Sequence, residues 1–335
     1  MTHNLDKLHE ALEGHSQLLI IPHNDPDPDA IAGSVGLRYL VSEKFGVEAK
    51  IGYRGIIGRA ENKALVRYLN NPLHKLDQKE IRQNIPIALI DTQPGAGNNP
   101  LPKNIPATIV IDHHVWRDAS SKAFFADIRP EIGASATILT EYIQTAELEI
   151  PSNLATALFY GIKTDTMGLG RGATPEDATA YFYLQPRIDA DALVQIERAQ
   201  VSPTYFQSLT AALQAARLYE GDLVISYIGD MKYPDLGAEI ADLLLRLQGV
   251  IWVICMGVYK DDLILSVRSR SMQIGAGKLV HQIIGDLGTA GGHGRMAGGH
   301  IRLHKQDPYQ LSVQLSKVAL QQIKGNASLV GNPLI

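Results

Sequence analysis

The sequence predicts an α/β protein: a mainly parallel N-terminal sheet with helices on both faces, a helical connection and a smaller C-terminal α/β domain. Two observations predict this class. In both halves of the chain, short apolar runs alternate with amphipathic stretches, which is typical of buried strands joined by helices. Residues 189–219 are helical in pattern and contain no strand-helix unit, so we expect them to connect the domains. The expected domains cover residues 1–188 and 220–328.

The expected elements of the first half follow from the apolar runs and their breaks. Thr174, Pro175, Glu176 and Asp177 are typical of a helix start, because a capping hydroxyl precedes proline and two acids. Helices are predicted at 29–45, 134–145, 153–162 and 175–184. Strands are predicted at 18–21, 47–53, 84–92 and 107–114, with a further strand within 121–128.

In the second half, three apolar runs and the segment HIRLHK indicate strands. These strands are expected at 222–228, 250–259, 261–270 and 300–305, with helices at 277–285 and 308–324. The last residues, SLVGNPLI, are expected to form a loose tail.

The composition argues against several classes of protein. A chain of 335 residues with a formal net charge of −4 is not expected to coat long nucleic acid, which favours strongly basic surfaces. The longest apolar runs, such as VIWVICMGVY, are too short to span a bilayer. The polar N-terminus does not resemble a signal peptide. The single cysteine, Cys255, lies in an apolar run and is expected to be buried. A cytoplasmic protein without membrane contact is therefore expected.

Acids and histidines follow three of the predicted strands. The stretch HNDPDPD (residues 23–29) follows the first strand, Asp91 ends IALID, and the residues Asp112, His113 and His114 end IVIDHH. Because the carboxyl ends of parallel strands meet at one edge, these side chains are expected to line one crevice. Asp165 follows a predicted helix and is expected to return to the same edge.

Aspartate and imidazole suit Mn²⁺, Mg²⁺, Fe²⁺ or Zn²⁺. Carboxylates gathered in one cleft repel each other, and a pair of divalent ions removes that conflict. Two ions about 3.5–4 Å apart fit phosphoester hydrolysis. Other interpretations stay open for single residues. Asp29 or Asp91 is also explained as a helix N-cap, and Asp25 as part of a turn. Adjacent histidines within a strand would point to opposite faces.

Four motifs together resemble the DHH phosphoesterase superfamily. They are HNDPDPD from His23, ID at Asp91, DHH at 112–114 and TDT around Asp165. Pro28 stands where the family commonly has glycine. In the second half, GGHGRMAGG (residues 291–299) and the preceding strand SVRSR resemble the DHH-associated domain, which binds substrate in that family.

The resemblance implies two divalent ions, with Mn²⁺ preferred and Mg²⁺ or Fe²⁺ as alternatives. One ion is bound by His23 and Asp27, the other by Asp29, His113 and Asp165, and Asp91 bridges them. Catalysis is assigned to Asp91, His113 and His114, with His114 contacting the scissile phosphate or supporting the site. Asp112 is expected to orient a histidine.

Substrate binding is assigned by resemblance to the second domain and to His114. The expected residues are Arg268, His293, Gly291, Gly292, Gly298 and Gly299, whose backbone amides would approach a phosphate. For Arg268 the alternative is a surface salt bridge. For Gly298 and Gly299 it is a tight turn before the next strand.

The expected function is hydrolysis of short oligonucleotides (nano-RNA or linear dinucleotides), of 3′-phosphoadenosine 5′-phosphate, or of both, by attack of a hydroxide that bridges the ions. The alternatives are a cyclic dinucleotide phosphodiesterase and a manganese inorganic pyrophosphatase. The non-enzyme alternative is a nucleotide-binding regulatory module. The expected partner is a short oligonucleotide or phosphorylated nucleotide, and a homodimer is a family-level expectation.

Overall fold

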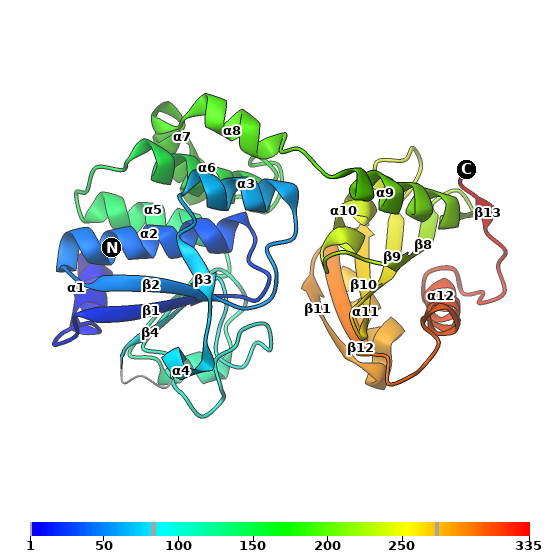
Figure 1. Ribbon diagram of the computed structural model, residues 1–335, viewed down its shortest axis with the longest axis horizontal. Coiled ribbons are helices and arrows are strands. Elements are labelled where there is room, and N and C mark those ends of the chain that lie inside the picture. Colours follow the sequence, from blue (N-terminus) through cyan, green and yellow to red (C-terminus); the bar gives the residue numbers. More distant parts are fainter. Residues whose placement is uncertain (1, 82–84, 272–274) are drawn as a thin grey trace. The chain divides into compact units, whose positions relative to one another are not determined.

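The computed structural model describes residues 2–81, 85–271 and 275–335. It consists of two compact units, residues 1–200 and 201–335, each with its own sheet (Figure 1). The predicted α/β class is confirmed in both units. Within the described residues, no helix is long and apolar enough to cross a membrane.

The first unit is built on a parallel sheet with the strand order β3-β2-β1-β4-β5-β6. Every neighbouring pair of these strands runs parallel, as predicted. The strands are β1 (Gln17–Pro22), β2 (Glu48–Tyr53), β3 (Leu73–Lys75), β4 (Ile87–Ile90), β5 (Ile109–Asp112) and β6 (Phe125–Ile128).

The strands of this sheet are buried on both faces because their apolar residues alternate between two cores. In β1, Leu18 and Ile20 belong to the larger core, while Leu19 and Ile21 belong to a smaller one. Helices cover the first face (Figure 1), and Ile81 of the short α4 (Gln78–Ile81) packs against the second. The remaining helices of the unit are α1 (Thr2–Glu10), α2 (Pro28–Phe45), α3 (Ala60–Tyr68), α5 (Ser135–Thr145), α6 (Ser152–Asp165), α7 (Pro175–Leu184) and α8 (Ala190–Glu197), with 3₁₀ turns at Asp118–Lys122 and Gln185–Arg187.

Helix α6 crosses α2 closely at a glycine. A Cβ added to Gly161 would lie 3.2 Å from the Cα of Asp29 and 3.2 Å from the Cβ of Ala32. Because residues four apart share a helix face, this crossing directs Asp165, the last residue of α6, toward the N-terminus of α2. The predicted helix 153–162 therefore extends three residues further than its apolar pattern indicated.

Three local differences from the predicted elements matter for function. The strand expected at 107–114 ends at Asp112, so His113 and His114 lie beyond it and the opposite-face argument does not apply. Helix α3 and strand β3 were not predicted, because polar residues interrupt the apolar pattern between 54 and 75. The helix start at Thr174 is confirmed, and Thr174 and Asp177 form a reciprocal capping box.

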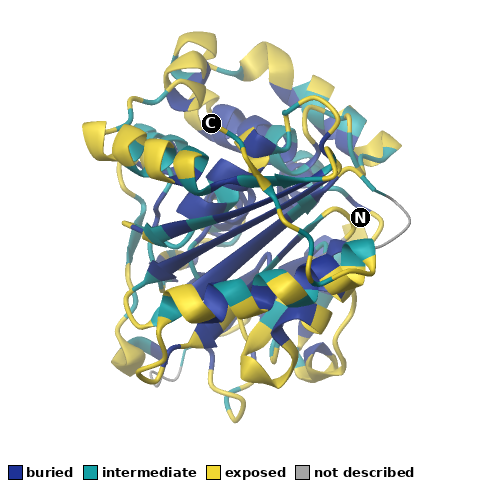
Figure 2. Ribbon diagram, turned by 90° about the vertical axis from the view of Figure 1, so that its right-hand side faces the viewer, coloured by how far each residue is buried: buried dark blue, intermediate teal, exposed yellow. Residues whose placement is uncertain are grey.

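The second unit contains a mixed sheet with the order β11-β12-β10-β9-β8-β7-β13. Its buried strands lie between helices whose outer faces are exposed (Figure 2). The strands are β7 (Arg217–Tyr219), β8 (Leu223–Asp230), β9 (Trp252–Tyr259), β10 (Asp262–Ser269), β11 (Thr289–His293), β12 (Met296–Arg302) and β13 (Asn332–Pro333). The helices are α9 (Pro203–Ala215), α10 (Leu236–Leu244), α11 (Ala276–Ile284) and α12 (Pro308–Lys324), with a 3₁₀ turn at Gly285–Leu287.

The segment expected to connect the domains is divided between the units. Helix α8 buries Leu193 and Ile196 in the core of the first unit, whereas α9 buries Ala212 in the second. The expectation of a loose C-terminal tail was wrong, because β13 pairs with β7 and Leu334 packs against the second unit's core. Cys255 is buried, as predicted.

Candidate metal centre

The register of three neighbouring strands brings the predicted site residues to one edge of the first sheet. Pro22 of β1 pairs with Ile90 of β4, and Ile90 pairs with Ile111 of β5. The next residues along each strand are His23, Asp91 and Asp112. All three therefore leave the sheet at the same level, at the carboxyl edge where open parallel sheets bind ligands.

The first motif is shaped by the start of α2. Asp27 is the N-cap, and its Oδ1 accepts a hydrogen bond from the Ala30 N–H at 3.0 Å. Pro28 occupies the first helical position, where its fixed φ suits the helix and its missing N–H costs nothing. Proline therefore fits this position of the motif. Asp25 anchors the loop instead, since its Oδ1 accepts from the Ile56 N–H at 2.6 Å.

Asp29 is fully buried and joins α2 to the start of α5. Its Oδ2 accepts from the Ser135 N–H at 2.6 Å, and its Oδ1 accepts from the Ala136 N–H at 2.8 Å. These amides belong to the first turn of α5 and have no partner within that helix. Asp29 is therefore not the N-cap of its own helix, α2. It instead accepts hydrogen bonds from the first amides of α5. Each carboxylate oxygen keeps a second lone pair for another ligand.

Asp91 lies at the centre of the cluster and is buried, with a left-handed φ of 58°. Its Oδ1 lies 3.3 Å from His113 Nε2 and 3.6 Å from His114 Nδ1, and its Oδ2 lies 3.4 Å from His23 Nε2. Ser135 Oγ donates to Oδ1 at 3.1 Å. A left-handed backbone is unfavourable for a non-glycine residue and is concentrated at functional sites.

Two histidines present one nitrogen to the carboxylates and use the other on the backbone. His113 Nδ1 lies 3.2 Å from the Ile132 carbonyl oxygen, and His23 Nδ1 lies 2.7 Å from that of Asn24. A carbonyl accepts only from a protonated Nδ1, which leaves the Nε2 lone pair for a cation. His113 Nε2 is buried and has no hydrogen-bond partner among the described residues. This unsatisfied buried atom fits a metal ligand.

Three overlapping groups in the described residues have the spacing of metal ligands, with donor atoms within 4.8 Å of one another. Asp91 belongs to two of the groups and His113 to two. The groups are His23, Asp27 and Asp91; Asp29, His113 and Asp165; and Asp91, His113 and His114. The first two groups together contain all six predicted ligands and fit two neighbouring cations.

The buried carboxylates of this cluster repel one another in spite of the imidazoles beside them. Burial, followed by the charge of Asp91, raises the pKa of Asp29 to about 7. Burial, followed by the charges of Asp27 and Asp29, raises the pKa of Asp165 well above its usual value. Burial also tends to raise the pKa of Asp91, but the imidazoles of His113 and His23 lower it well below its usual range. A divalent cation would remove the repulsion that holds protons on two of these acids.

Asp112 and His114 form the outer part of the cluster. Asp112 Oδ1 lies 2.8 Å from His114 Nδ1 and accepts from the His113 N–H at 2.9 Å. The contact orients the His114 ring, whose side chain is 40% exposed.

Gln93 is a residue of the site that the sequence did not reveal. It is buried, and its amide donates to Asp112 Oδ2 at 2.7 Å and to the Val115 carbonyl at 3.0 Å. Its Oε1 accepts from the Arg117 N–H at 2.8 Å and from Ser120 Oγ at 3.0 Å. Gln93 thereby fixes Asp112 and the segment after His114. No sequence signal identifies it beyond its place two residues after Asp91.

The predicted substrate-binding residues lie in the second unit. Arg268, on β10, donates through Nε to Asp242 at 2.6 Å and through one terminal nitrogen to the Val267 carbonyl. The structure therefore shows the salt bridge of Arg268 with Asp242 that was the alternative interpretation. A role of Arg268 in substrate binding stays a prediction. The His293 side chain lies outside the described part of the structure.

The four glycines lie in the β11–β12 hairpin, and they differ in the space around them. A Cβ on Gly292 would lie 2.4 Å from the Ala297 Cα, and one on Gly299 would lie 1.9 Å from the Ile284 Cδ1. Gly291 has open space, and the nearest atom to a Cβ on its partner Gly298 is 3.4 Å away. Gly298 and Gly299 lie within β12 rather than in a turn before it. Close packing accounts for Gly292 and Gly299, whereas a side chain would fit at Gly298 and would meet open space at Gly291.

Comparison with known proteins identifies the first unit. Residues 17–162 match the model of the DHH family, N-terminal domain. The chain carries a DHH domain. The match includes the first three predicted motifs and confirms the resemblance seen in this half, while Asp165 lies just beyond its end.

Two relatives and one solved structure extend the comparison. An uncharacterized protein of Methanocaldococcus jannaschii is 36% identical over 300 residues, which are 89% of this chain and 60% of that protein. The "Probable manganese-dependent inorganic pyrophosphatase" of Streptococcus pyogenes is 20% identical over 62% of this chain and 65% of its own length. The chain thus spans less than two thirds of either relative. An exopolyphosphatase-related protein from Bacteroides fragilis shares the fold, with a TM-score of 0.77, 16% identity and 97% of each chain covered.

Proposed function

We propose that the protein is a divalent-metal-dependent phosphoesterase that acts on short oligonucleotides, on 3′-phosphoadenosine 5′-phosphate, or on both. One observation carries the proposal: two groups of three ligands, His23–Asp27–Asp91 and Asp29–His113–Asp165, stand side by side, with Asp91 in contact with histidines of both. A regulatory module without chemistry has no use for six converging ligands. The DHH domain and the name of the S. pyogenes relative support a metal-dependent hydrolase, with Mn²⁺ as the proposed ion.

The protein residues of the proposed site have separate tasks. His23, Asp27, Asp29, Asp91, His113 and Asp165 would hold two cations, which supply a Lewis acid and lower the pKa of water. His114, oriented by Asp112, would contact the phosphate that is cleaved. The fixed tautomers of His23 and His113 mean that neither ring has to reorganise when a cation binds. The open Gly291–Gly298 face of the second unit would offer backbone amides to a distal phosphate. We place the reaction in the cytoplasm.

The second candidate is a manganese inorganic pyrophosphatase, favoured by the 20% identical relative of that name. A pyrophosphatase needs no surface for a nucleoside. The open glycine hairpin and the lack of a lysine- and arginine-rich segment at residues 291–299 favour the nucleotide substrate.

The deciding experiment compares four substrates at one Mn²⁺ concentration: a dinucleotide, 3′-phosphoadenosine 5′-phosphate, cyclic di-AMP and pyrophosphate. We expect turnover of the dinucleotide or the bisphosphate, abolished by EDTA and by Asp91→Asn. Turnover of pyrophosphate alone would replace the first candidate with the second, and turnover of cyclic di-AMP alone would indicate a cyclic dinucleotide phosphodiesterase. Bound manganese without turnover of any of the four would refute an enzyme of this class.

A further inference from the structure

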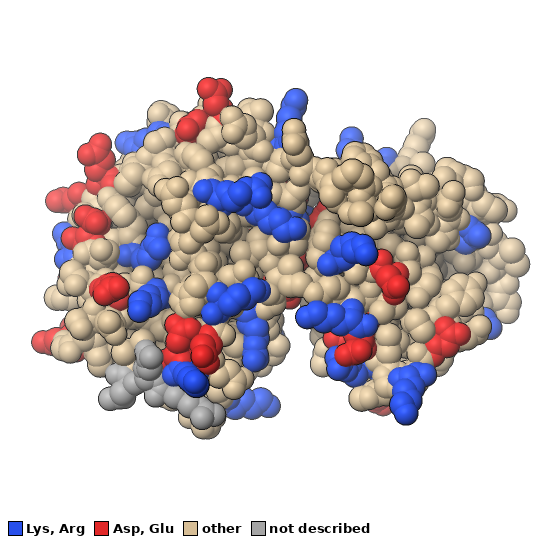
Figure 3. Space-filling view, in the orientation of Figure 1, with Lys and Arg blue, Asp and Glu red and all other residues tan. Residues whose placement is uncertain are grey.

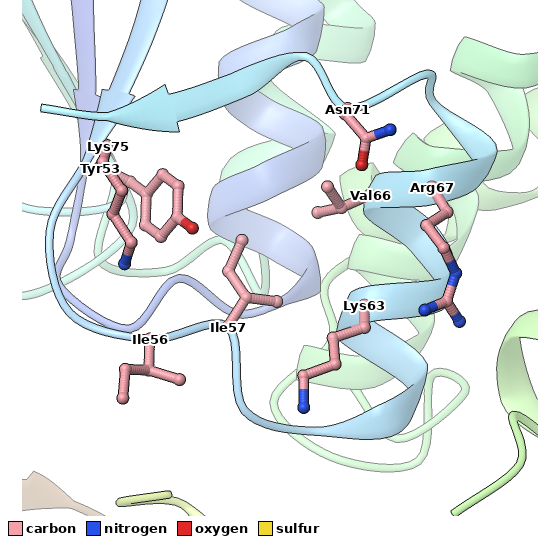
Figure 4. A pocket seen from close by; sticks show the side chains of 8 residues that line it. All are labelled: Tyr53, Ile56, Ile57, Lys63, Val66, Arg67, Asn71 and Lys75. Carbon is pink, nitrogen blue, oxygen red and sulfur yellow. The ribbon is translucent and has the colours of Figure 1, made fainter.

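Two parts of the first unit's surface differ in how their side chains are partnered. A hollow of about 410 Å³ lies beside the end of β2 and one face of α3 (Figure 4), where Lys and Arg side chains gather (Figure 3). Lys75 in this hollow donates to the Gly55 carbonyl and lies 4.1 Å from the centre of the Tyr53 ring, so its charge is satisfied within the protein. At the metal centre, in contrast, apolar side chains are exposed. This second surface is the one that needs a ligand to explain it.

Exposed apolar side chains follow two of the proposed metal ligands along the chain. Trp116 comes three residues after His113 and is 46% exposed, and Met167 comes two residues after Asp165 and is 66% exposed. His113 Nε2 lies 3.6 Å from Asp165 Oδ2, so the loops that carry the two apolar residues begin side by side. A substrate whose phosphate reaches these ligands therefore has both loops beside it.

A buried glutamine holds the loop that carries Trp116. The Gln93 side-chain amide donates to the Val115 carbonyl at 3.0 Å, and Gln93 Oε1 accepts from the Arg117 N–H at 2.8 Å. The backbone is therefore fixed on both sides of Trp116. Among the described residues, the indole N–H makes no hydrogen bond and the ring makes no aromatic contact. A fixed backbone beneath an exposed ring is a preorganised contact surface, which lowers the entropy lost when a ligand binds.

The loop that carries Met167 is held in a similar way. Thr166 is buried, and its Oγ1 donates to the Ile162 carbonyl at 2.6 Å and accepts from the Leu169 N–H at 3.0 Å. Met167 has a left-handed φ of 50°, which is unfavourable for a residue with a Cβ and is usually given to glycine at a helix end. Its exposed side chain gains little from packing within the protein. A ligand that covers Met167 would offset both disadvantages, and strain of this kind is concentrated at functional sites.

The chemistry of these side chains selects the part of a substrate that they would contact. Indole and thioether groups carry no charge, so neither would hold a phosphate. Nucleobases stack on aromatic side chains, and thioethers pack favourably against aromatic rings. Val115, directly before Trp116, adds another exposed apolar side chain. A nucleotide offers a flat base to such a surface, whereas pyrophosphate has no apolar part.

We propose that Trp116 and Met167 bind the base of the nucleoside that carries the cleaved phosphate, and so select nucleotides over phosphates without a base. Gln93 and Thr166 are the positioning residues of this surface. The inference rests on the proposed function, because it takes the metal centre to bind a phosphate ester. It fails separately if the protein cleaves nucleotides whose base does not contact Trp116.

The test is binding of AMP, ribose 5-phosphate and inorganic phosphate to the full chain in Mg²⁺, measured by calorimetry and by fluorescence. The chain has two tryptophans, and Trp252 is buried in the second unit, so Trp252→Phe leaves Trp116 as the source of the indole signal. We expect AMP to quench this signal and ribose 5-phosphate to leave it unchanged. AMP should bind at least about fivefold more tightly than ribose 5-phosphate, the lower range for stacking of one base.

Substitutions separate contact with the base from support of the fold. Trp116→Ala should weaken AMP binding to the strength of ribose 5-phosphate binding and leave ribose 5-phosphate binding unchanged, whereas Trp116→Phe should retain part of the difference. Met167→Gly relieves the left-handed backbone, so it should weaken AMP binding while the thermal unfolding midpoint stays unchanged or rises. The matched control is Phe182→Ala, an aromatic side chain on α7 that is 61% exposed, which should bind AMP as the natural protein does.

Several results would overturn the inference: no AMP binding, AMP binding no tighter than that of ribose 5-phosphate, an unquenched Trp116, or full AMP affinity in Trp116→Ala. Equal loss of both ligands in Trp116→Ala would also overturn it, because Trp116 would then support the phosphate site. A fluorescence change on dilution without nucleotide would assign Trp116 to a contact between copies of the chain instead. Hydrolysis of a nucleotide that leaves Trp116 unquenched would keep the proposed function and discard this base-binding surface.

Discussion

The carboxyl edge of the first sheet and the glycine hairpin of the second unit gather polar groups in opposite ways. At the sheet edge, buried side chains converge, and Asp29 and Asp91 each make several fixed contacts. In the hairpin, Gly291 and Gly298 offer backbone alone; Gly291 faces open space, and the nearest atom to a Cβ on Gly298 would be 3.4 Å away. The difference teaches that contacts within the protein hold the side chains of the sheet-edge cluster in place. The glycine hairpin has no such side-chain contacts, and only ligand binding can show whether it has a role.

The largest effect is expected at the centre of the sheet-edge cluster. Asp91→Asn keeps the shape and tolerates the left-handed φ, but it removes the charge that three histidines face. We expect Mn²⁺-dependent hydrolysis to fall by more than about 100-fold, the upper range for altering an outer-sphere partner. Steady-state kinetics measure it. Activity within a few-fold of the natural protein would show that Asp91 is not a ligand.

Metal binding should stabilise one unit and not the other. At a free Mn²⁺ concentration of 100 times Kd, binding adds about 2.7 kcal/mol to the free energy of unfolding. Amide hydrogen exchange should therefore slow around β1, β4 and β5 and stay unchanged in β11 and β12. Equal slowing in both regions would contradict the contrast between the two sites.

Without metal, the first unit should lose stability as pH rises. The pKa of Asp29 is about 7 in the folded state, against about 3.9 for an unfolded aspartate. The folded state therefore binds more protons in this window, and the stability present below pH 4 is lost as pH rises toward 7. The raised pKa values of His23 and His113 act in the same direction above about pH 6.5.

Urea unfolding in EDTA between pH 4.5 and 7.5 measures this dependence. Asp29→Asn should flatten it, and added Mn²⁺ should reverse it, because metal binding requires deprotonated ligands. A metal-free protein whose stability rises over this range would show that Asp29 is ionised there.

Asp112→Asn tests the orientation of His114. The change weakens the contact at His114 Nδ1 without removing a proposed ligand, so we expect activity to fall by about 10–100-fold with Mn²⁺ affinity retained. A shift in the pH–rate profile should accompany the fall, since a merely structural role would leave the profile in place. Unchanged kinetics would show that Asp112 does not orient His114 for catalysis.

The smallest effects on stability and activity are expected in the hairpin, where closely packed glycines and glycines with free space should respond differently to substitution. Gly292→Ala meets the Ala297 Cα at 2.4 Å and should cost at least about 1 kcal/mol of stability. Gly291→Ala has open space and should leave thermal unfolding unchanged while raising KM. If Gly291→Ala changed neither KM nor stability, the open face would have no role in substrate binding.

Much of the fold could be predicted because its signals are local. Helix α12 begins at Pro308 and ends at Lys324 as predicted, and β1, β4 and β5 overlap the apolar runs that predicted them. The convergence of His23, Asp91 and Asp112 followed from the rule that the carboxyl ends of parallel strands meet at one edge. Gln93 could not be predicted, because its role consists of contacts with residues about 20 to 30 positions away. Helix α3 was missed because nine residues with a polar face give a weak period.

The proposed ligands are spread from His23, just after β1, to Asp165, at the last turn of α6. Among the described residues, no short segment holds a complete group of three, apart from Asp91 with the histidines of the third motif. In small zinc domains the ion drives folding, because the unfolded chain has no preformed site and the binding free energy becomes folding free energy. Here α6 must already lie across α2 before Asp165 reaches His113. A ribosome would release nearly the whole first unit before the proposed ligands could converge, so we expect the protein to fold first and to bind divalent metal afterwards.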